Sequence, residues 1–236
     1  MTTAAALSDE DYLRETSVAA GRYFEGAPAT EILQWAHQAF GPALVVASSM
    51  GDGVVAHLAS QVAPGVDVLF LDTGYHFAET LGTRDAVAAT LDVNVRTVLP
   101  LLTVNEQDAE YGARLHDSDP DLCCALRKVE PLNRGLAPYL AWASGLRRDE
   151  ALSRRKTRVV EWDAKRGKVK VNPIAAWTAA DVEEYVTTNG VLVNPLLTEG
   201  YLSIGCAPCT RKPLAGADAR SGRWAGTGKV ECGIHS

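Results

Sequence analysis

The alternation of short apolar runs with helical patterns is the feature that most limits how this chain can fold. Residues 43–47 form a short apolar run bounded by turn residues, which is typical of a buried strand. Residues 66–71 are expected to form a second buried strand and residues 93–98 a third strand. Between them, residues 54–61 and 78–91 show the spacing of apolar side chains expected for helices. This order predicts an α/β fold with a doubly wound, mostly parallel sheet and helices on both of its faces.

Weaker signals extend this prediction along the chain. Thr30 is expected to cap a helix that ends at Gly41. After the first three strands, we expect a fourth strand at residues 139–144 and two short ones at 159–162 and 168–171. The sheet is therefore predicted to continue well beyond the first three strands.

The last third of the chain changes in character. A capping pattern at Thr178 and Asp181 opens the last predicted helix, which ends near Gly190. From Gly205 onward the chain is rich in Gly, Pro and small residues, so we expect an irregular and mobile tail. The sequence thus divides into an N-terminal helical segment, an α/β domain and a C-terminal tail, at 1–42, 43–204 and 205–236.

Length and composition limit the class of protein. The chain has 236 residues, of which 47% are hydrophobic, so it can bury a sizeable core. No apolar run approaches the roughly 18 residues of a membrane span, and residues 1–15 lack the pattern of a signal peptide. We therefore expect a cytoplasmic protein without membrane contact, whose five cysteines are reduced, metal-bound or catalytic.

Charge is unevenly distributed along the chain. The formal net charge of −6 argues against general nucleic-acid binding. Two basic clusters stand out against this background: Arg147, Arg148, Arg154, Arg155, Lys156 and Arg158, and then Arg211, Lys212, Arg220, Arg223 and Lys229. Local basic clusters on an acidic protein suit a small anionic ligand, although solvated basic loops would give the same pattern.

Three polar turns follow predicted strands, at the strand ends where open α/β sheets bind ligands. The first turn consists of Ser48, Ser49, Met50, Gly51, Asp52 and Gly53. Its glycines would let backbone N–H groups approach a phosphate at the start of a helix. It lacks the Gly-Lys-Ser/Thr of a Walker loop, so an ordinary strand–helix turn is an equal alternative. The other two turns begin at Asp72 and Gly145.

The cysteines give a sharper signal. Cys123 and Cys124 are adjacent, Cys206 and Cys209 form a Cys-x-x-Cys pair, and Cys232 is left over. Four thiolates in two pairs predict a four-cysteine metal site. Adjacent cysteines would form a strained chelate on one zinc ion but fit two irons of a cubane, so we favour a [4Fe–4S] cluster over zinc. A Cys-x-x-Cys redox dithiol would leave the adjacent pair unexplained.

These residues carry a family resemblance. The chain resembles the assimilatory adenylyl-sulfate reductases of bacteria from about Ala43 onward, whereas the N-terminal helices carry little of the likeness. The resemblance rests on these segments: Leu71 to Gly74, Cys123-Cys124 with Arg127 to Leu132, Gly145 to Glu150, Gly205 to Cys209, Gly222 to Trp224 and Glu231 to His235. In fold the family is similar to ATP pyrophosphatases, with a modified phosphate loop.

The resemblance implies a reaction. Adenosine 5′-phosphosulfate is reduced to sulfite and AMP, in sulfate assimilation and cysteine biosynthesis. Cys232 matches the nucleophile that attacks the sulfur and becomes an S-sulfocysteine. Thioredoxin then frees sulfite through a transient mixed disulfide. The four other cysteines would hold the [4Fe–4S] cluster, and a homo-oligomer is compatible with this family.

The resemblance also implies a set of substrate-binding residues. Lys128 matches a lysine between cluster and substrate, and Arg220 and Arg223 match arginines that hold the phosphosulfate and the closed tail. Arg154 matches a further arginine, with Arg155 as the alternative register. The complete predicted set is Ser48, Ser49, Gly51, Asp52, Gly53, Asp72, Lys128, Gly145, Arg154, Arg220, Arg223 and His235.

Three other functions compete with this one. A reductase for the 3′-phosphorylated nucleotide, PAPS, is the nearest, but such enzymes usually lack the four cluster cysteines. A nucleotide-activating sulfurtransferase or ATP pyrophosphatase with a metal site predicts ATP turnover and leaves the tail motif around Cys232 unexplained. A non-enzymatic iron–sulfur sensor would need neither that cysteine nor arginines around a sulfate.

Overall fold

One six-stranded sheet organises the part of the chain described by the computed structural model, residues 9–216 and 218–235. Its strands are β1 (Leu44–Ala47), β2 (Val66–Leu71), β3 (Val93–Val98), β4 (Ala141–Ser144), β5 (Val160–Asp163) and β6 (Lys168–Val171). The order is β3-β2-β1-β4-β6-β5, and every neighbouring pair is parallel except β5 with β6. The predicted mostly parallel α/β fold is confirmed.

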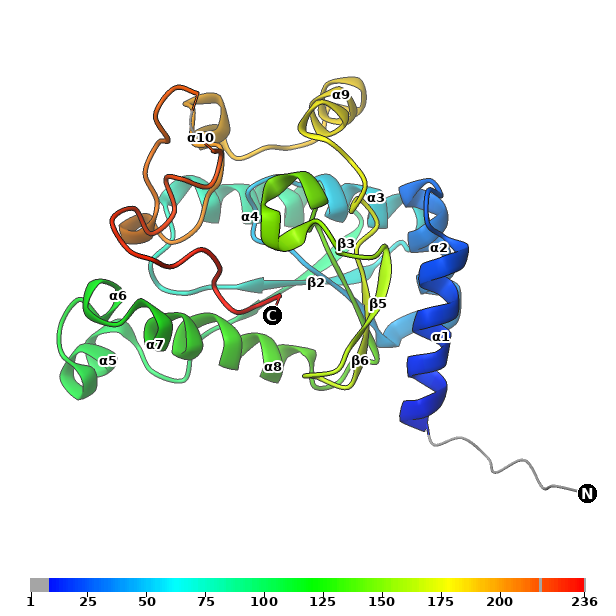
Figure 1. The fold of residues 1–236 in the computed structure, drawn as a ribbon, viewed down its shortest axis with the longest axis horizontal. Helices are drawn as coiled ribbons and strands as arrows, with labels where there is room; N and C mark the ends of the chain where they lie inside the picture. The colour runs from blue at the N-terminus through cyan, green and yellow to red at the C-terminus, as the bar shows by residue number, and fades with distance from the viewer. Residues whose placement is uncertain (1–8, 217, 236) are drawn as a thin grey trace, which may run out of the picture.

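Helices cover both faces of the sheet (Figure 1). On one side lie α2 (Ala29–Phe40), α3 (Val54–Val62) and α4 (Ala78–Thr90), and on the other lie α7 (Pro120–Cys124) and α8 (Glu130–Leu136). Helix α1 (Asp9–Tyr23) packs against β5 and β6 at the sheet edge, and α9 (Ala179–Asn189) lies beyond α3. This arrangement leaves the carboxyl ends of the central strands free of helices.

Alternating side chains of the central strands build two hydrophobic cores. In β1, Val46 joins the core formed with α2, α3 and α4, whereas Val45 joins the core formed with α8. Val68 and Leu69 of β2 divide in the same way. Because successive strand residues point to opposite faces, a strand buried on both faces is mostly apolar; β1 is apolar throughout, and β2 is apolar except for Asp67.

Most predicted helix ends are confirmed, and one is wrong. Thr178 and Asp181 form a reciprocal capping box at the start of α9, and Gly190 ends it with φ 62°. Thr30 does not cap α2, because the helix already begins at Ala29. Pro28 precedes it with φ −57°, so the fixed φ of the ring leads the chain into the first turn without a side-chain cap.

The segment between β3 and β4 contains helices that were not predicted from the sequence. They are α5 (Val104–Tyr111), α6 (Leu115–Ser118), α7, the π-helical turn η2 (Ala125–Val129) and α8. Pro131 has no N–H to donate to the carbonyl of Arg127 four residues earlier, which explains a π-turn at this point. The turn carries Arg127 and Lys128 into the protein, where both are buried.

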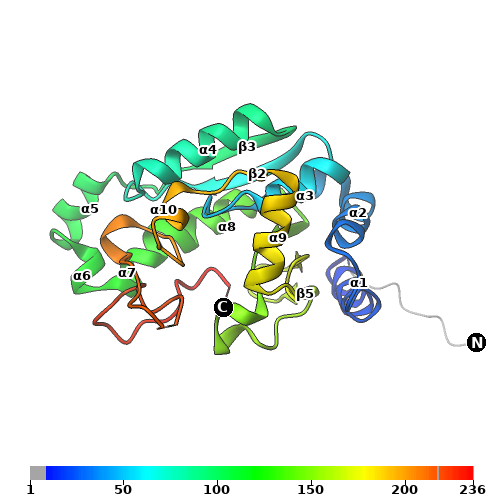
Figure 2. The same cartoon turned by 90° about the horizontal axis from the view of Figure 1, so that it is seen from above.

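The tail is irregular, as predicted. After α10 (Pro195–Thr198), the structure has only the short turn η5 (Ala207–Cys209) and a bridge between Thr210 and Arg223. Seen from above, the tail folds back beneath α10 and returns toward the centre of the molecule (Figure 2). Residues 1–8 of the predicted N-terminal segment, and 217 and 236 of the predicted tail, lie outside the described residues. No helix in the described part is long and apolar enough to cross a membrane.

The contact between α1 and β5 yields a stability prediction. A Cβ atom added at Gly21 would lie 2.3 Å from the carbonyl oxygen of Val160, so Gly21→Ala must push α1 away from the sheet. We expect a loss of about 1–3 kcal/mol of unfolding free energy. At Gly82 in α4 an added Cβ meets nothing within 4 Å, so Gly82→Ala should stabilise the helix by up to about 1 kcal/mol. The unfolding free energies of Gly21→Ala and Gly82→Ala are measured by urea unfolding. Equal changes in the two variants would contradict the close packing of α1 against β5.

Candidate active site

An open pocket lies at the carboxyl ends of β1, β2 and β4, with about 1420 Å³ of empty space, its mouth included. It brings together most of the predicted substrate-binding set and Cys232: Ser48, Ser49, Gly51, Asp52, Lys128, Gly145, Arg154, Arg220, Arg223, Cys232 and His235. These residues come from four distant parts of the chain. Arg154 is buried at the pocket and Arg155 is exposed, so the geometry favours Arg154 of the two registers.

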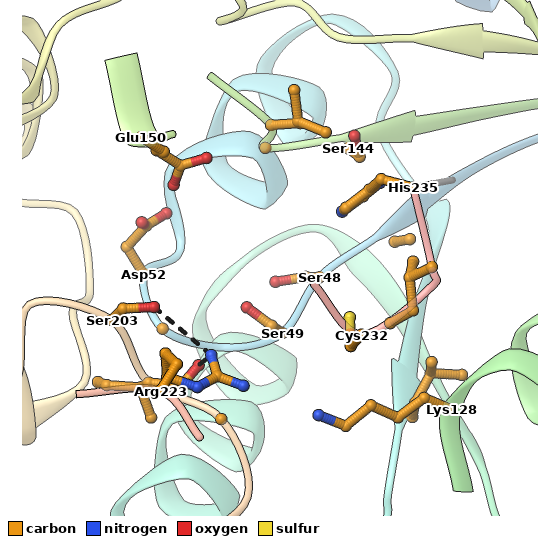
Figure 3. Close-up of a pocket in the computed structure, with 18 of the residues that line it drawn as sticks. Ser48, Ser49, Asp52, Lys128, Ser144, Glu150, Ser203, Arg223, Cys232 and His235 are labelled. Atoms are coloured by element: carbon orange, nitrogen blue, oxygen red, sulfur yellow. Dashed lines mark hydrogen bonds between the residues drawn. The ribbon is translucent and has the colours of Figure 1, made fainter. Parts of the chain in front are cut away.

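The turn after β1 is held by its own side chains. The hydroxyl of Ser48 accepts a hydrogen bond from the backbone N–H of Met50 at 3.2 Å. The carboxyl of Asp52 accepts one from Val54 at 3.1 Å, at the first residue of α3. Burial raises the pKa of Asp52, although the N–H of Val54 opposes this shift. Ser49 is left with its hydroxyl directed into the pocket (Figure 3).

Two predicted site residues do not line the pocket. Gly53 donates its N–H to the carbonyl of Leu192 at 2.9 Å, and a Cβ there would lie 3.0 Å from the same oxygen. Asp72 accepts a hydrogen bond from Gly74 at 3.0 Å and pairs with Arg84 at 3.8 Å. Both residues shape the turns beside the pocket.

A small recess next to the pocket is lined by all four cysteines of the predicted metal site. Cys123 and Cys124 end α7, and Cys206 and Cys209 flank η5. Burial and the three other cysteines raise the pKa of Cys123 to about 12, and burial and Cys206 raise that of Cys209 to about 11. These four thiols would repel one another as thiolates, so a positive centre is required to hold them all deprotonated.

Lys128 lies between this recess and the pocket and lines both. Burial opposes its charge, but attraction to the thiolate forms of Cys206, Cys232 and Cys124 outweighs that effect and raises its pKa. Lys128 is 8% exposed, and no carboxylate among the described residues pairs with it. Its ammonium group therefore stays charged and available at the pocket.

Arg223 brings a second cation to the pocket. Its guanidinium donates to the carbonyl of Ile204 at 3.2 Å and to the hydroxyl of Ser203 at 3.4 Å, and no described carboxylate pairs with it. A Cβ at Gly205 would lie 2.1 Å from this guanidinium, so a glycine is needed there. Figure 3 shows the charged ends of Arg223 and Lys128 pointing toward each other, with Cys232 beside them. Two buried cations that face each other form an anion site.

The tail residues around Cys232 are firmly docked. Glu231 binds Arg154 at two atom pairs, both 2.8 Å, and Arg220 at 3.1 Å. His235 stacks on Trp142, with ring centroids 5.8 Å apart and planes 5° apart. Burial, together with the charge of nearby cations, holds the pKa of His235 well below its ordinary value, so the stacked ring is neutral. Cys232 is half-buried between these two anchors.

Several residues of the site were not predicted from the sequence. They are Thr73, His76, Ser144, Glu150, Ser203 and Glu231. Glu231 and Glu150 lie inside motifs that carried the family resemblance, so those motifs could have identified them. His76 gave no signal: its ring nitrogen bonds the carbonyl oxygen of Leu71 at 2.8 Å, and burial lowers its pKa.

Comparison with known proteins agrees with this geometry. Residues 42–212 match the family described as the phosphoadenosine phosphosulfate reductase domain. A Streptomyces coelicolor protein named adenosine 5′-phosphosulfate reductase is 66% identical over 223 residues, 94% of each chain. A protein of the same name from Mycolicibacterium smegmatis is 55% identical and covers 97% of each chain.

Solved structures place the chain in the same group. The phosphoadenylyl-sulfate reductase of Candida auris, a phosphate complex, has a TM-score of 0.71 and 29% identity over 88% of this chain and 100% of that one. FMN adenylyltransferase of Candida glabrata, with a TM-score of 0.56 and 12% identity over 89% of this chain and 69% of that one, shares the fold alone. The chain therefore belongs to the phosphoadenosine phosphosulfate reductase family, together with the bacterial adenosine 5′-phosphosulfate reductases.

Proposed function

We propose that this protein reduces adenosine 5′-phosphosulfate to sulfite and AMP, with Cys232 as the nucleophile. The observation that carries the proposal is the position of Cys232 beside two buried cations, Lys128 and Arg223, that no described carboxylate neutralises. A phosphosulfate is an anion that would compensate both charges. The names of the most similar relatives describe the same substrate.

The proposed substrate contacts follow from the pocket walls. Ser48, Ser49 and the backbone at Gly51, next to the N-terminal end of α3, would face the nucleotide with hydroxyl and N–H groups. Asp52, Gly145 and His235 complete the wall, while Gly53 and Asp72 act by shaping the turns. Lys128 and Arg223 would hold the sulfate end close to Cys232.

The proposed reaction has two stages. The thiolate of Cys232 attacks the sulfur, an S–S bond forms, the S–O bond to the phosphate breaks, and AMP leaves. One thiol of reduced thioredoxin then attacks the cysteine sulfur and displaces sulfite, leaving a mixed disulfide. The second thioredoxin thiol resolves that disulfide and restores Cys232. The dithiol supplies the two electrons that take sulfur from sulfate to sulfite.

A [4Fe–4S] cluster is the cofactor that we propose for the four-cysteine recess. A single zinc would need all four sulfurs within about 2.3 Å of one point. No group of three or more His, Cys, Asp or Glu side chains in the described residues is placed to hold a metal ion, so the choice between zinc and a cluster rests on the spacing of the cysteines along the chain. A cubane spreads its ligands over four irons, which suits an adjacent pair and a Cys-x-x-Cys pair. Such a cluster would link α7 to η5. Its charge would also contribute to the electrostatic field at the ammonium group of Lys128.

The choice between the two sulfonucleotides can be measured directly. The four-cysteine recess and the names of the relatives favour the nucleotide without a 3′-phosphate, so kcat/KM for adenosine 5′-phosphosulfate should exceed that for PAPS by at least about tenfold. Sulfite release is assayed with reduced thioredoxin and its regenerating system. A larger kcat/KM for PAPS would show that the proposed substrate assignment is wrong. Release of pyrophosphate that depends on ATP would favour the ATP pyrophosphatase alternative.

A further inference from the structure

Glu231 makes the densest set of ionic contacts in the tail, directly before Cys232. We propose that Glu231 is a latch that positions Cys232 in the pocket, and that Arg154 and Arg220 are the two partners that hold this latch. This inference rests on the proposed function of Cys232 as nucleophile. It adds the residue that holds the nucleophile in place.

The contacts of Glu231 are specific in geometry. Arg154 approaches with Nε on one carboxylate oxygen and Nη2 on the other, in the bidentate form that fixes orientation as well as distance. Arg220 adds a hydrogen bond to Oε2 at 3.1 Å and another to the carbonyl of Val230 at 3.1 Å. Ser153 adds a weaker bond at 3.3 Å. A carboxylate held by these groups has little freedom to rotate. The backbone of Glu231 is therefore fixed, and this restricts the position of Cys232, the next residue along the chain.

Charge balance supports the same assignment. Burial, and then the charge of Arg154, lower the pKa of Arg220, because two guanidiniums share one partly enclosed space. Glu231 lies on both of them and compensates that repulsion, and Glu150 pairs with Arg154 from the other side. The two arginines thus already have carboxylate partners, whereas Lys128 and Arg223 have none among the described residues.

A second anchor lies beyond Cys232. Ile234 packs against the core beside α8, and His235 stacks on Trp142. The nucleophile is therefore fixed on both sides, by an ionic contact before it and an apolar one after it. Since the apolar anchor does not depend on Glu231, loss of the latch should free the cysteine without unfolding the protein.

The test compares Glu231→Gln with a matched control, Glu130→Gln. The amide of the first variant keeps the size of the side chain but presents an NH₂ group to either the buried Arg154 or the partly buried Arg220. Among the described residues, Glu130 forms an ion pair with Arg134 alone, on the surface of α8, so its variant should behave as wild type. Glu231→Asp keeps the charge and should recover part of the lost function.

The first readout needs no substrate. Iodoacetamide labelling of Cys232 is followed in nucleotide-free protein as the mass of the tryptic peptide 230–236, which cleavage after Lys229 releases. We expect Glu231→Gln to raise the labelling rate about tenfold or more, because the closed tail becomes a minor population. Labelling as a function of pH separates this change from a change in thiolate fraction: a latch raises the plateau rate at high pH, whereas a charge effect only moves the midpoint.

The second readout is kinetic. With adenosine 5′-phosphosulfate in single turnover, formation of the S-sulfocysteine should slow about tenfold or more in Glu231→Gln, while the dissociation constant of AMP changes less than about threefold. An unchanged plateau labelling rate would overturn the latch. Much tighter nucleotide binding with an unchanged rate of adduct formation would also overturn it, since Glu231 would then be a competitor of the substrate. If wild-type protein released no sulfite, the labelling experiment would still test the latch.

Discussion

Cys232→Ser is expected to lower kcat by at least about 10³-fold. A serine hydroxyl is far less ionised than a thiol at neutral pH, and a sulfo group on the serine oxygen would not be released by thiol exchange, because there would be no S–S bond for a thiol to break. The cysteine lies outside the recess that holds the other four, so the variant should keep its iron and bind AMP with nearly unchanged affinity. Sulfite release under thioredoxin regeneration is the measurement.

A neighbouring position provides the control for this variant. Val230 lies in the same tail and its side chain is 71% exposed, so Val230→Ala should retain nearly full activity. Activity of Cys232→Ser above about 1% of wild type would contradict the assignment. So would an equal loss of activity in both variants, because the tail would then matter as a whole rather than through its thiol.

Replacing any one of the four recess cysteines with serine is expected to remove the metal centre. Cys124→Ser should lower the iron content from about four per chain to near zero and abolish the broad visible absorption. Turnover should be lost with it, because the proposed cluster would tie α7 to η5 and Lys128 lies between that recess and the pocket.

Hydrogen exchange can locate the effect of the lost cluster. In Cys124→Ser, the amides of α7 and of η5 should exchange faster, while those of β2 in the core should not change. Cys232→Ser is the matched control, since it removes a thiol but should keep the metal and the slow exchange. A colourless wild-type protein with one zinc per chain would contradict the cluster.

The fold was largely predictable because short strand patterns alternate with helical patterns along the first hundred residues. Strands β2 and β3 begin and end at the predicted residues, and Thr178 caps α9 as expected. The helices between β3 and β4 were missed because they are short and because Pro131 interrupts the regular spacing with a π-turn. Thr103 caps α5 and Asp119 caps α7, but a cap without a long amphipathic stretch behind it is a weak signal for a helix.

The site was predictable in its residue types but not in its partnerships. Sequence motifs predicted the same kind of role for Arg154, Arg220 and Arg223. The structure separates them: Arg154 and Arg220 pair with Glu231, whereas Arg223 pairs with no described carboxylate. Gly53 was predicted to contact the ligand, but its close approach to Leu192 is a long-range contact that no local pattern encodes. Partner choice depends on tertiary packing, which motif spacing does not specify.

The central claim, that Cys232 takes the sulfur from the substrate, is tested most directly by mass. Wild-type protein is incubated anaerobically with adenosine 5′-phosphosulfate and no reductant. The protein is then digested with trypsin, and the mass of the peptide 230–236 is measured by mass spectrometry. We predict that this peptide gains the mass of one SO₃ group as AMP appears in equal amount, and that reduced thioredoxin removes the added mass and releases sulfite. An adduct on another peptide, or AMP formation with no adduct at all, would contradict the account.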